Sequence, residues 1–147
     1  MDGLDRMDLA IVEALRRDGR ITATELGARV GLSPSACSRR VRRLEEEGVL
    51  LGYGAAVNEA ALGRGLSAIL FISLQSQTEE HLSAFERAVR QCPNVVEGYL
   101  LSGQFDYALR VVARDVADYE RIHKEQLSRL PGVSRIQSNF VLRKVAG

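Results

Sequence analysis

The chain has 147 residues, of which 46% are hydrophobic, enough to bury the core of one domain or of two small ones. Its 20 lysines and arginines nearly balance its 19 aspartates and glutamates, so any affinity for DNA must come from a local patch and not from the whole chain. No apolar run is long enough to span a membrane, and residues 1–6 resemble neither a signal nor a transit peptide, so we expect a cytoplasmic protein without a membrane partner.

The first helix is predicted to begin at Asp5. This residue suits the N-cap, and Asp8 follows three residues later as the acidic partner of a capping box. Leu4 and Leu9 stand at the two positions of a hydrophobic staple, and residues 18–19 are a suitable end for the helix. The inward side of this helix is expected to consist of four apolar residues: Leu9, Ile11, Val12 and Leu15.

A second, short helix is predicted from the capping box that Thr22 and Glu25 form. It runs to about Val30 and ends at Gly31, and only one further residue separates that glycine from Ser33, the next N-cap. Two helices joined by a tight glycine turn have the spacing of a helix-turn-helix motif.

The helix that follows is specified at both ends. Ser33 is a good N-cap, Pro34 fits the first helical position, and Gly48 can adopt the left-handed conformation that ends a helix. At 100° per residue, three apolar side chains share one narrow stripe: Cys37, Val41 and Leu44. The sequence therefore predicts a helix that packs along this stripe and exposes its other side.

The exposed side of this helix is rich in arginine. Between positions 28 and 44 there are five arginines and no acidic residue, and guanidinium groups both contact phosphates and pair with guanine. Arg39 and Arg43 lie opposite the apolar stripe and are expected to face the major groove, whereas Arg29, before the turn, is expected to contact a phosphate. The predicted DNA-binding residues are Arg29, Ser33, Ser35, Ala36, Ser38, Arg39, Arg40, Arg42 and Arg43. A solvated basic surface is the alternative for the arginines taken alone.

The chain is expected to divide after this motif. Residues 49–54 indicate a short extended segment, the wing or strut of a winged helix-turn-helix domain that would comprise residues 1–54. Residues 55–65 lose periodicity and gain glycine, which is typical of a linker. The second domain is then predicted to span residues 66–147.

The second domain alternates strands and helices in the order β-α-β-β-α-β. The expected elements are a strand at 66–74, a helix capped by Thr78, strands at 95–101 and 105–113, a helix that begins at Asp115, and a strand at 133–145. This order matches the ferredoxin-like, split βαβ motif, in which two helices cover one face of a four-stranded antiparallel sheet. The fold class is therefore predicted as α+β.

The first strand of this domain is apolar on both sides. Its two faces carry Leu66, Ala68, Leu70 and Ile72 on one side and Ile69 and Phe71 on the other. Because the helices cover only one face, a second copy of the chain is the simplest cover for the other. A symmetric homodimer would also supply the two recognition helices that a palindromic operator requires.

The chain resembles the Lrp/AsnC, or feast/famine, family of transcription regulators over nearly all its length. The motifs that carry the resemblance are Leu4-Asp5 with Asp8 and Ile11-Val12, Asp18-Gly19-Arg20, Glu25-Leu26, Val30-Gly31-Leu32-Ser33, Arg40-Val41, Arg43-Leu44-Glu45, Gly48-Val49-Leu50, Gly52-Tyr53 and the turn at residues 102–107. The resemblance implies a DNA-binding domain joined to an ACT-like domain that binds an effector and oligomerises. Double-stranded DNA and an amino acid or related metabolite are the implied partners, and dimers that often assemble into octamers are the implied form.

The resemblance places the effector at the turn of residues 102–107. The implied effector-binding residues are Ser102, Gly103, Gln104, Phe105, Asp106, Tyr107 and Ser138. Asp106 can accept a hydrogen bond from an ammonium group, and the glycine-containing turn can bring backbone N–H groups close to a carboxylate. Phe105 is expected to share a strand face with Tyr107, and which aromatic ring lines the pocket stays open. Ser138 would come from a neighbouring subunit.

Two other classes of function are alternatives for this chain. An enzyme is disfavoured because His81 and His123 lie inside predicted surface helices, with no nucleophile pair or metal-site spacing around them. Cys37 and Cys92 also lack the spacing of a disulfide or metal site, so no metal and no cofactor other than the small effector is expected. The remaining alternative is a metabolite-binding ferredoxin-like module without specific DNA binding.

Overall fold

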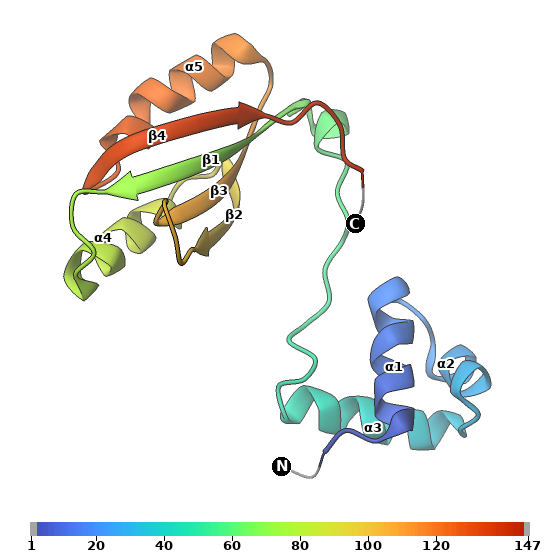
Figure 1. The fold of residues 1–147 in the computed structure, drawn as a ribbon. Helices are drawn as coiled ribbons and strands as arrows, with labels where there is room; N and C mark the ends of the chain where they lie inside the picture. The colour runs from blue at the N-terminus through green and yellow to red at the C-terminus, as the bar shows by residue number, and fades with distance from the viewer. Residues whose placement is uncertain (1–2, 146–147) are drawn as a thin grey trace. The chain divides into compact units, whose positions relative to one another are not determined.

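The computed structural model describes residues 3–145 and divides into two compact units, Met1–Ala56 and Val57–Gly147 (Figure 1). The elements in chain order are α1 (Arg6–Arg17), α2 (Ala23–Val30), α3 (Pro34–Glu46), the 3₁₀ helix η1 (Glu59–Leu62), β1 (Leu66–Leu74), α4 (Glu79–Val89), β2 (Val95–Leu100), β3 (Tyr107–Ala113), α5 (Val116–Glu125), the 3₁₀ helix η2 (Leu127–Arg129) and β4 (Val133–Phe140). Among these residues, no helix has the length and apolar character needed to cross a lipid bilayer.

The helices of the first unit begin where their caps predict. The Asp5 carboxylate accepts the Asp8 N–H at 2.8 Å, and the Asp8 carboxylate accepts the Asp5 N–H at 3.1 Å. Thr22 and Glu25 form the same reciprocal pair at the start of α2. Both pairs satisfy N–H groups that a helix leaves without an internal partner, so the predicted capping boxes are confirmed.

The turn between α2 and α3 is a glycine in the left-handed conformation. Gly31 has φ 73°, and the Ser33 hydroxyl accepts the Ala36 N–H at 3.2 Å to begin α3. A second glycine of this unit, Gly27, is buried where a Cβ would lie 2.5 Å from the Leu32 carbonyl oxygen. The close approach of the turn to α2 therefore requires glycine at this position.

The core of the first unit joins all three helices. Its fully buried apolar side chains are Ile11, Leu26, Cys37 and Leu44. The stripe predicted for α3 is thus confirmed, but Leu9 is 55% exposed and its predicted place in the core is wrong. Leu9 and Ile11 are two positions apart, which is 200° around a helix, so they cannot share one face, and Asp8 takes the inward position instead.

The segment after α3 contains no wing strand. Gly48 ends the helix with φ 71°, and residues 49–56 have no regular structure and pair with no strand of the described chain. The helix-turn-helix part of the prediction is confirmed, whereas the expected wing does not form. Tyr53 instead lies against the helices, where its hydroxyl donates to Glu45 at 2.8 Å. The region predicted as linker contains a short 3₁₀ helix, Glu59–Leu62, capped by Asn58.

The second unit is a four-stranded antiparallel sheet in the order β2-β3-β1-β4. The central strand β1 pairs with β3 and β4, so Leu70 lies opposite Leu109 on one side and Ser138 on the other. Phe85 of α4 and Ile122 of α5 pack in one core with the alternate residues of β1 and β3. Both helices therefore cover the same face of the sheet, as the ferredoxin-like prediction requires.

Three strand boundaries differ from the sequence prediction. β2 ends at Leu100 and β3 begins at Tyr107, because the Leu101 N–H donates to the Asp106 carbonyl at 2.8 Å and closes a longer turn between them. β4 was expected to reach residue 145 but ends at Phe140. Val141 still donates its N–H to the Ser67 carbonyl at 2.8 Å, and since the partner β1 begins at Leu66, residues 143–145 have no residue of β1 opposite them.

Phe85 provides a test of the second core. Its side chain is fully buried and its ring lies 4.5 Å from the ring of Tyr107, so Phe85→Ala should lower the free energy of unfolding of this unit by about 3 to 5 kcal/mol. Urea unfolding followed by near-ultraviolet circular dichroism of the tyrosines measures the loss. Val116→Ala, at a position that is 61% exposed, serves as the control and should change the stability by less than about 0.5 kcal/mol. Equal losses in both variants would contradict the packing.

Candidate functional site

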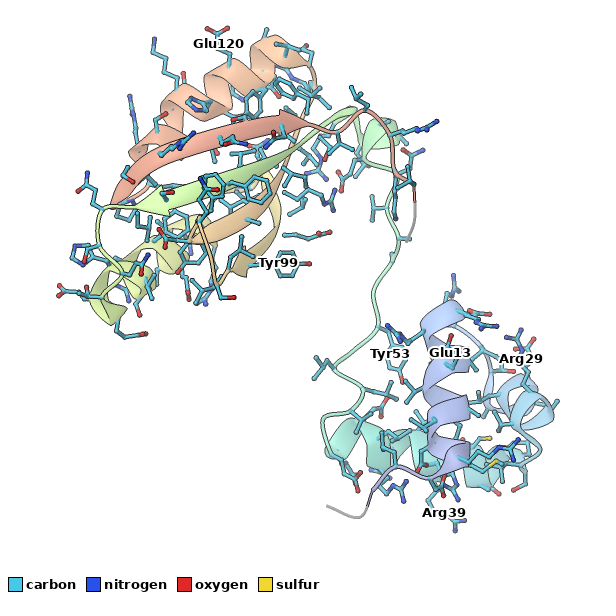
Figure 2. The ribbon with its side chains drawn as sticks, viewed as in Figure 1. Glu13, Arg29, Arg39, Tyr53, Tyr99 and Glu120 are labelled. Atoms are coloured by element: carbon cyan, nitrogen blue, oxygen red, sulfur yellow. The ribbon has the colours of Figure 1, made fainter. Side chains whose placement is uncertain are left out.

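The face of α3 that points away from the first core is polar and basic. Its exposed side chains are Ser35, Ser38, Arg39, Arg42 and Arg43, and Figure 2 shows Arg39 and Arg29 projecting away from the helices of this unit. Arg39 forms no ion pair with any of the described residues. Arg42 lies 3.3 Å from Glu46, but both side chains are largely exposed, and a surface pair of this kind is weak and easily exchanged.

Two of the four α3 arginines face α1 instead. Arg40 donates to Asp8 at 2.8 Å and to Asp5 at 2.6 Å, and Arg43 donates to the other oxygen of Asp8 at 2.5 Å. The Arg43 side chain is 45% exposed, as expected for an outward-facing residue, but its guanidinium is bound to Asp8 in the absence of DNA. The helical projection placed only the Cα–Cβ direction, and the long side chain folds back toward a carboxylate that another helix supplies.

Asp8 is the centre of this cluster, and its side chain is only 1% exposed. Burial alone raises the pKa of Asp8, but the hydrogen bonds from Arg40, from the Asp5 amide and from Arg43 outweigh it, so the pKa lies below the ordinary value. Asp8 is thus a charged group inside the protein. The sequence analysis assigned Asp8 only to a helix cap, because the spacing of 32 residues to Arg40 gives no local signal.

The remaining predicted DNA-binding residues surround the start of α3. Ser33 caps the helix, and its hydroxyl also lies 3.2 Å from the hydroxyl of Ser35. Ala36 is half-buried, whereas Arg29 in the last turn of α2 is exposed. The nine predicted residues therefore lie on α2, on α3 or at the cap of α3. Of their arginines, Arg40 and Arg43 contact α1, whereas the other three do not.

The predicted effector turn projects from the sheet between β2 and β3. Residues 102–104 are exposed, and Gly103 has φ 152°, a conformation that favours glycine. Asp106 is buried at the base of the turn, where its two carboxylate oxygens accept the Leu74 N–H at 2.7 Å and the Gln77 amide at 2.6 Å. Through these two hydrogen bonds Asp106 joins the turn to the end of β1 and to the loop that follows it.

Phe105 and Tyr107 do not share a face, contrary to the prediction. The Phe105 ring stacks on Phe71 with a centroid separation of 5.2 Å, whereas Tyr107 is buried on the helix side and donates to Glu86 at 3.0 Å. Burial and the neighbouring Glu86 raise the pKa of the Tyr107 hydroxyl above its ordinary value. The alternation of faces fails here because Phe105 precedes the first residue of β3 and belongs to the turn.

Ser138 lies apart from the turn within one chain. It stands opposite Leu70 in β4, on the far side of β1 from β3, and it accepts a hydrogen bond from Tyr119 of α5 at 2.5 Å. The structure therefore brings together the six predicted effector residues 102–107 but not the seventh, which was assigned to a neighbouring subunit.

Sequence reasoning missed a cavity of about 370 Å³ between α4 and β2. Val89, Val95 and Leu109 form its apolar wall, and Glu86, Arg90 and Tyr99 stand at its polar side. These residues belong to elements that only the folded sheet brings together, so no local motif could have indicated the cavity. Its size is that of a small-molecule site.

Each of the two units matches a known domain family. Residues 4–50 match a winged helix-turn-helix DNA-binding domain, and residues 67–146 match an Lrp/AsnC ligand-binding domain. The Bkd operon transcriptional regulator of Pseudomonas aeruginosa is 41% identical over 145 residues, which cover 99% of this chain and 95% of that protein. The leucine-responsive regulatory protein of Escherichia coli K12 is 39% identical over 142 residues, which cover 97% and 87%.

A solved structure has the same arrangement of elements. The complex of a transcriptional regulator from Neisseria meningitidis with L-Met superposes with a TM-score of 0.91 and 32% sequence identity, covering 99% of this chain and 94% of that chain. A helix-turn-helix unit followed by this sheet defines a DNA-binding transcription regulator with a ligand-binding domain. The chain belongs to the Lrp/AsnC family.

Proposed function

We propose that this regulator binds a palindromic operator as a symmetric dimer or a larger assembly such as an octamer, and that an α-amino acid modulates its DNA binding or its assembly. The observation that carries the DNA part is the exposed face of α3, on which Arg39 and Arg42 stand free of α1. The L-Met complex of the Neisseria meningitidis regulator supports an amino acid as the effector class. We expect no catalysis, because the relatives named above are transcription regulators, and binding to chromosomal DNA assigns the protein to the cytoplasm.

The proposed interface consists of α3 in the major groove and the end of α2 against the DNA backbone. Of the nine residues expected from the sequence, those proposed to contact DNA are Arg29, Ser33, Ser35, Ala36, Ser38, Arg39 and Arg42, whereas Arg40 and Arg43 are held by Asp8 and border the interface. Arg39 is the strongest candidate for base contact, because it is exposed, opposite the apolar stripe, and near the N-terminal half of the helix that enters the groove. Arg29 lies on the preceding helix, where a phosphate is the expected partner.

Arg39→Ala should weaken operator binding by about 1 to 3 kcal/mol if a bidentate base contact is lost. Arg29→Ala should weaken binding to all sequences similarly. It should also lower the magnitude of the slope of log K against log salt by about one. Fluorescence anisotropy with the DNA upstream of the protein's own gene and with random duplex measures both effects. Arg87→Ala, an exposed arginine of α4, serves as the control.

The same titration distinguishes the proposed regulator from the alternative function. A metabolite-binding module without specific DNA binding would bind the upstream DNA no more tightly than the random duplex, and Arg39→Ala would then change neither affinity.

The proposed dimer uses the sheet face opposite the helices. Ile69 and Phe71 of β1 are half-buried there, and the ring of Phe105 extends the apolar surface. Arg110 lies beside Ile69 in the pairing register and forms an ion pair with Glu97 at 2.8 Å, so a polar margin borders this surface. An apolar centre with a polar rim is the usual composition of a subunit interface.

Phe71→Glu should convert the assembly into folded monomers, because a carboxylate in the centre of the interface would be buried without a partner. Analytical ultracentrifugation of the full chain at micromolar concentration measures the change, with circular dichroism as the check on folding. Val116→Glu, on the exposed side of α5, is the matched control and should leave the assembly unchanged. A dimeric, folded Phe71→Glu protein would exclude the sheet face as the interface.

The proposed effector site is the turn that follows β2. Its residues are Ser102, Gly103, Gln104, Phe105, Asp106 and Tyr107, with Ser138 contributed by a neighbouring subunit. Backbone N–H groups around Gly103 can receive the carboxylate of an amino acid. Asp106 already accepts one hydrogen bond at each oxygen, and since each oxygen has two lone pairs, an ammonium group can still be accepted.

A thermal-shift screen of the twenty amino acids tests this site. An effector at 100 times its dissociation constant should stabilise the protein by about 2.7 kcal/mol. Asp106→Asn keeps an acceptor for the Leu74 N–H but removes the charge, so it should abolish the shift while operator binding is retained. Asp115→Asn, at the exposed N-cap of α5, removes a carboxylate without touching the turn and should keep the full shift. Undiminished effector binding to a folded Asp106→Asn protein would locate the site elsewhere.

A further inference from the structure

We propose that Asp8 is a positioning residue that decides which arginines of α3 are available to DNA. It holds Arg40 and Arg43 against α1 and leaves Arg39 and Arg42 as the free guanidinium groups of the recognition helix. This inference rests on the proposed function of α3 as the DNA-contacting helix, and it names the residue that selects the contacting side chains.

The first step is the burial of Asp8. Its side chain is 1% exposed, and its carboxylate accepts three hydrogen bonds, from Arg40, from Arg43 and from the Asp5 N–H. A carboxylate that is shielded from water is stable only when charged partners and hydrogen bonds replace the lost hydration. Within the described residues the two charged partners are both arginines of α3, so the positive charge that compensates the burial of Asp8 comes from that helix.

The second step compares the four arginines. A move of Arg40 or Arg43 to DNA would leave the buried charge of Asp8 with one partner fewer, which is unfavourable for a carboxylate that is 1% exposed. The partner of Arg42 is Glu46, whose side chain is 69% exposed and can be hydrated when Arg42 leaves. Arg39 has no ion pair to break with any residue from 3 to 145. The arrangement therefore divides the arginines into two held and two free groups.

The third step concerns the orientation of α3. Asp8 lies on α1, and Arg40 and Arg43 lie one turn apart on α3, so two charged contacts fix α3 about its own axis. Since Arg39 and Arg42 lie on the adjacent side, their direction toward the groove follows from the same contacts. If position 8 served only to fill the core, an apolar residue would suffice there. Such a residue would not fix the rotation of α3 about its axis, and it would not hold Arg40 and Arg43.

Asp8→Asn in the full chain tests the proposal. Asparagine has the same size and can still accept the Asp5 N–H, so the helix cap is retained while the charge is lost. Released Arg40 and Arg43 should raise the affinity for random duplex DNA and steepen the slope of log K against log salt by about one to two. The preference for the upstream DNA over the random duplex should fall at the same time. A role in stability alone would lower the melting temperature without changing this slope.

Asp5→Asn is the matched control. Among the arginines of α3, Asp5 contacts only Arg40; its side chain is 49% exposed and asparagine is an equally good N-cap, so the slope should change little. Arg43→Ala in the otherwise unchanged protein provides an arm that does not depend on the folding of Asp8→Asn. The slope for random DNA should stay the same in Arg43→Ala and fall by about one in Arg39→Ala or Arg42→Ala.

The outcomes separate this inference from the proposed function. If Arg39→Ala and Arg43→Ala lower the slope equally, or if folded Asp8→Asn keeps the original slope, Asp8 does not select the arginines. If no α3 variant changes the affinity or the slope, α3 does not contact DNA, and the proposed function itself fails.

Discussion

The second unit depends on one constraint, which is that β1 is apolar on both faces and pairs on both edges. One face of the strand, with Leu70 at its centre, forms the core with Phe85 and Ile122 from the two helices. The other face carries Ile69 and Phe71, and α4 and α5, which pack on the Leu70 side, do not cover it. A second copy of the same sheet satisfies that face in the proposed dimer, and the symmetry of the dimer would then supply a pair of recognition helices.

The first unit shows how a nearly neutral chain can present a basic surface. The net charge of +1 gives no general attraction to DNA, so the arrangement of a few guanidinium groups decides where positive charge is exposed. Asp8 binds two of these groups, although the side chains of Arg40 and Arg43 remain 27% and 45% exposed. A local carboxylate therefore affects the electrostatic character of α3 more than the overall composition does.

The turn at residues 102–107, the proposed effector site, is joined to the sheet by Asp106 and Phe105. Asp106 accepts the backbone N–H of Leu74 at the end of β1 and the side chain of Gln77 in the next loop, so the turn cannot move without affecting both. Phe105 of the same turn stacks on Phe71, which lies on the face proposed for the dimer. A ligand bound at the turn would thus be one side chain away from the subunit interface, which gives effector binding a direct route to assembly.

The sequence by itself determined the elements whose signals are local. Capping residues such as Asp5, Thr22 and Ser33 begin their helices as predicted, the glycine turn lies before α3, and a nearly continuous apolar run defines β1, because each of these depends on neighbours within a few positions. The order of strands and helices then led to the α+β fold, and the helix-turn-helix spacing led to the family.

Only the tertiary structure decided the use of individual side chains. The contact of Asp8 with Arg40 joins residues 32 positions apart, the separation of Phe105 from Tyr107 depends on where β3 begins, and the short β4 depends on the length of its partner. Periodicity gives the direction in which a side chain leaves the backbone, but the end of a long side chain lies wherever a distant element offers it a charge or an apolar surface. The free and held arginines of α3 differ for that reason.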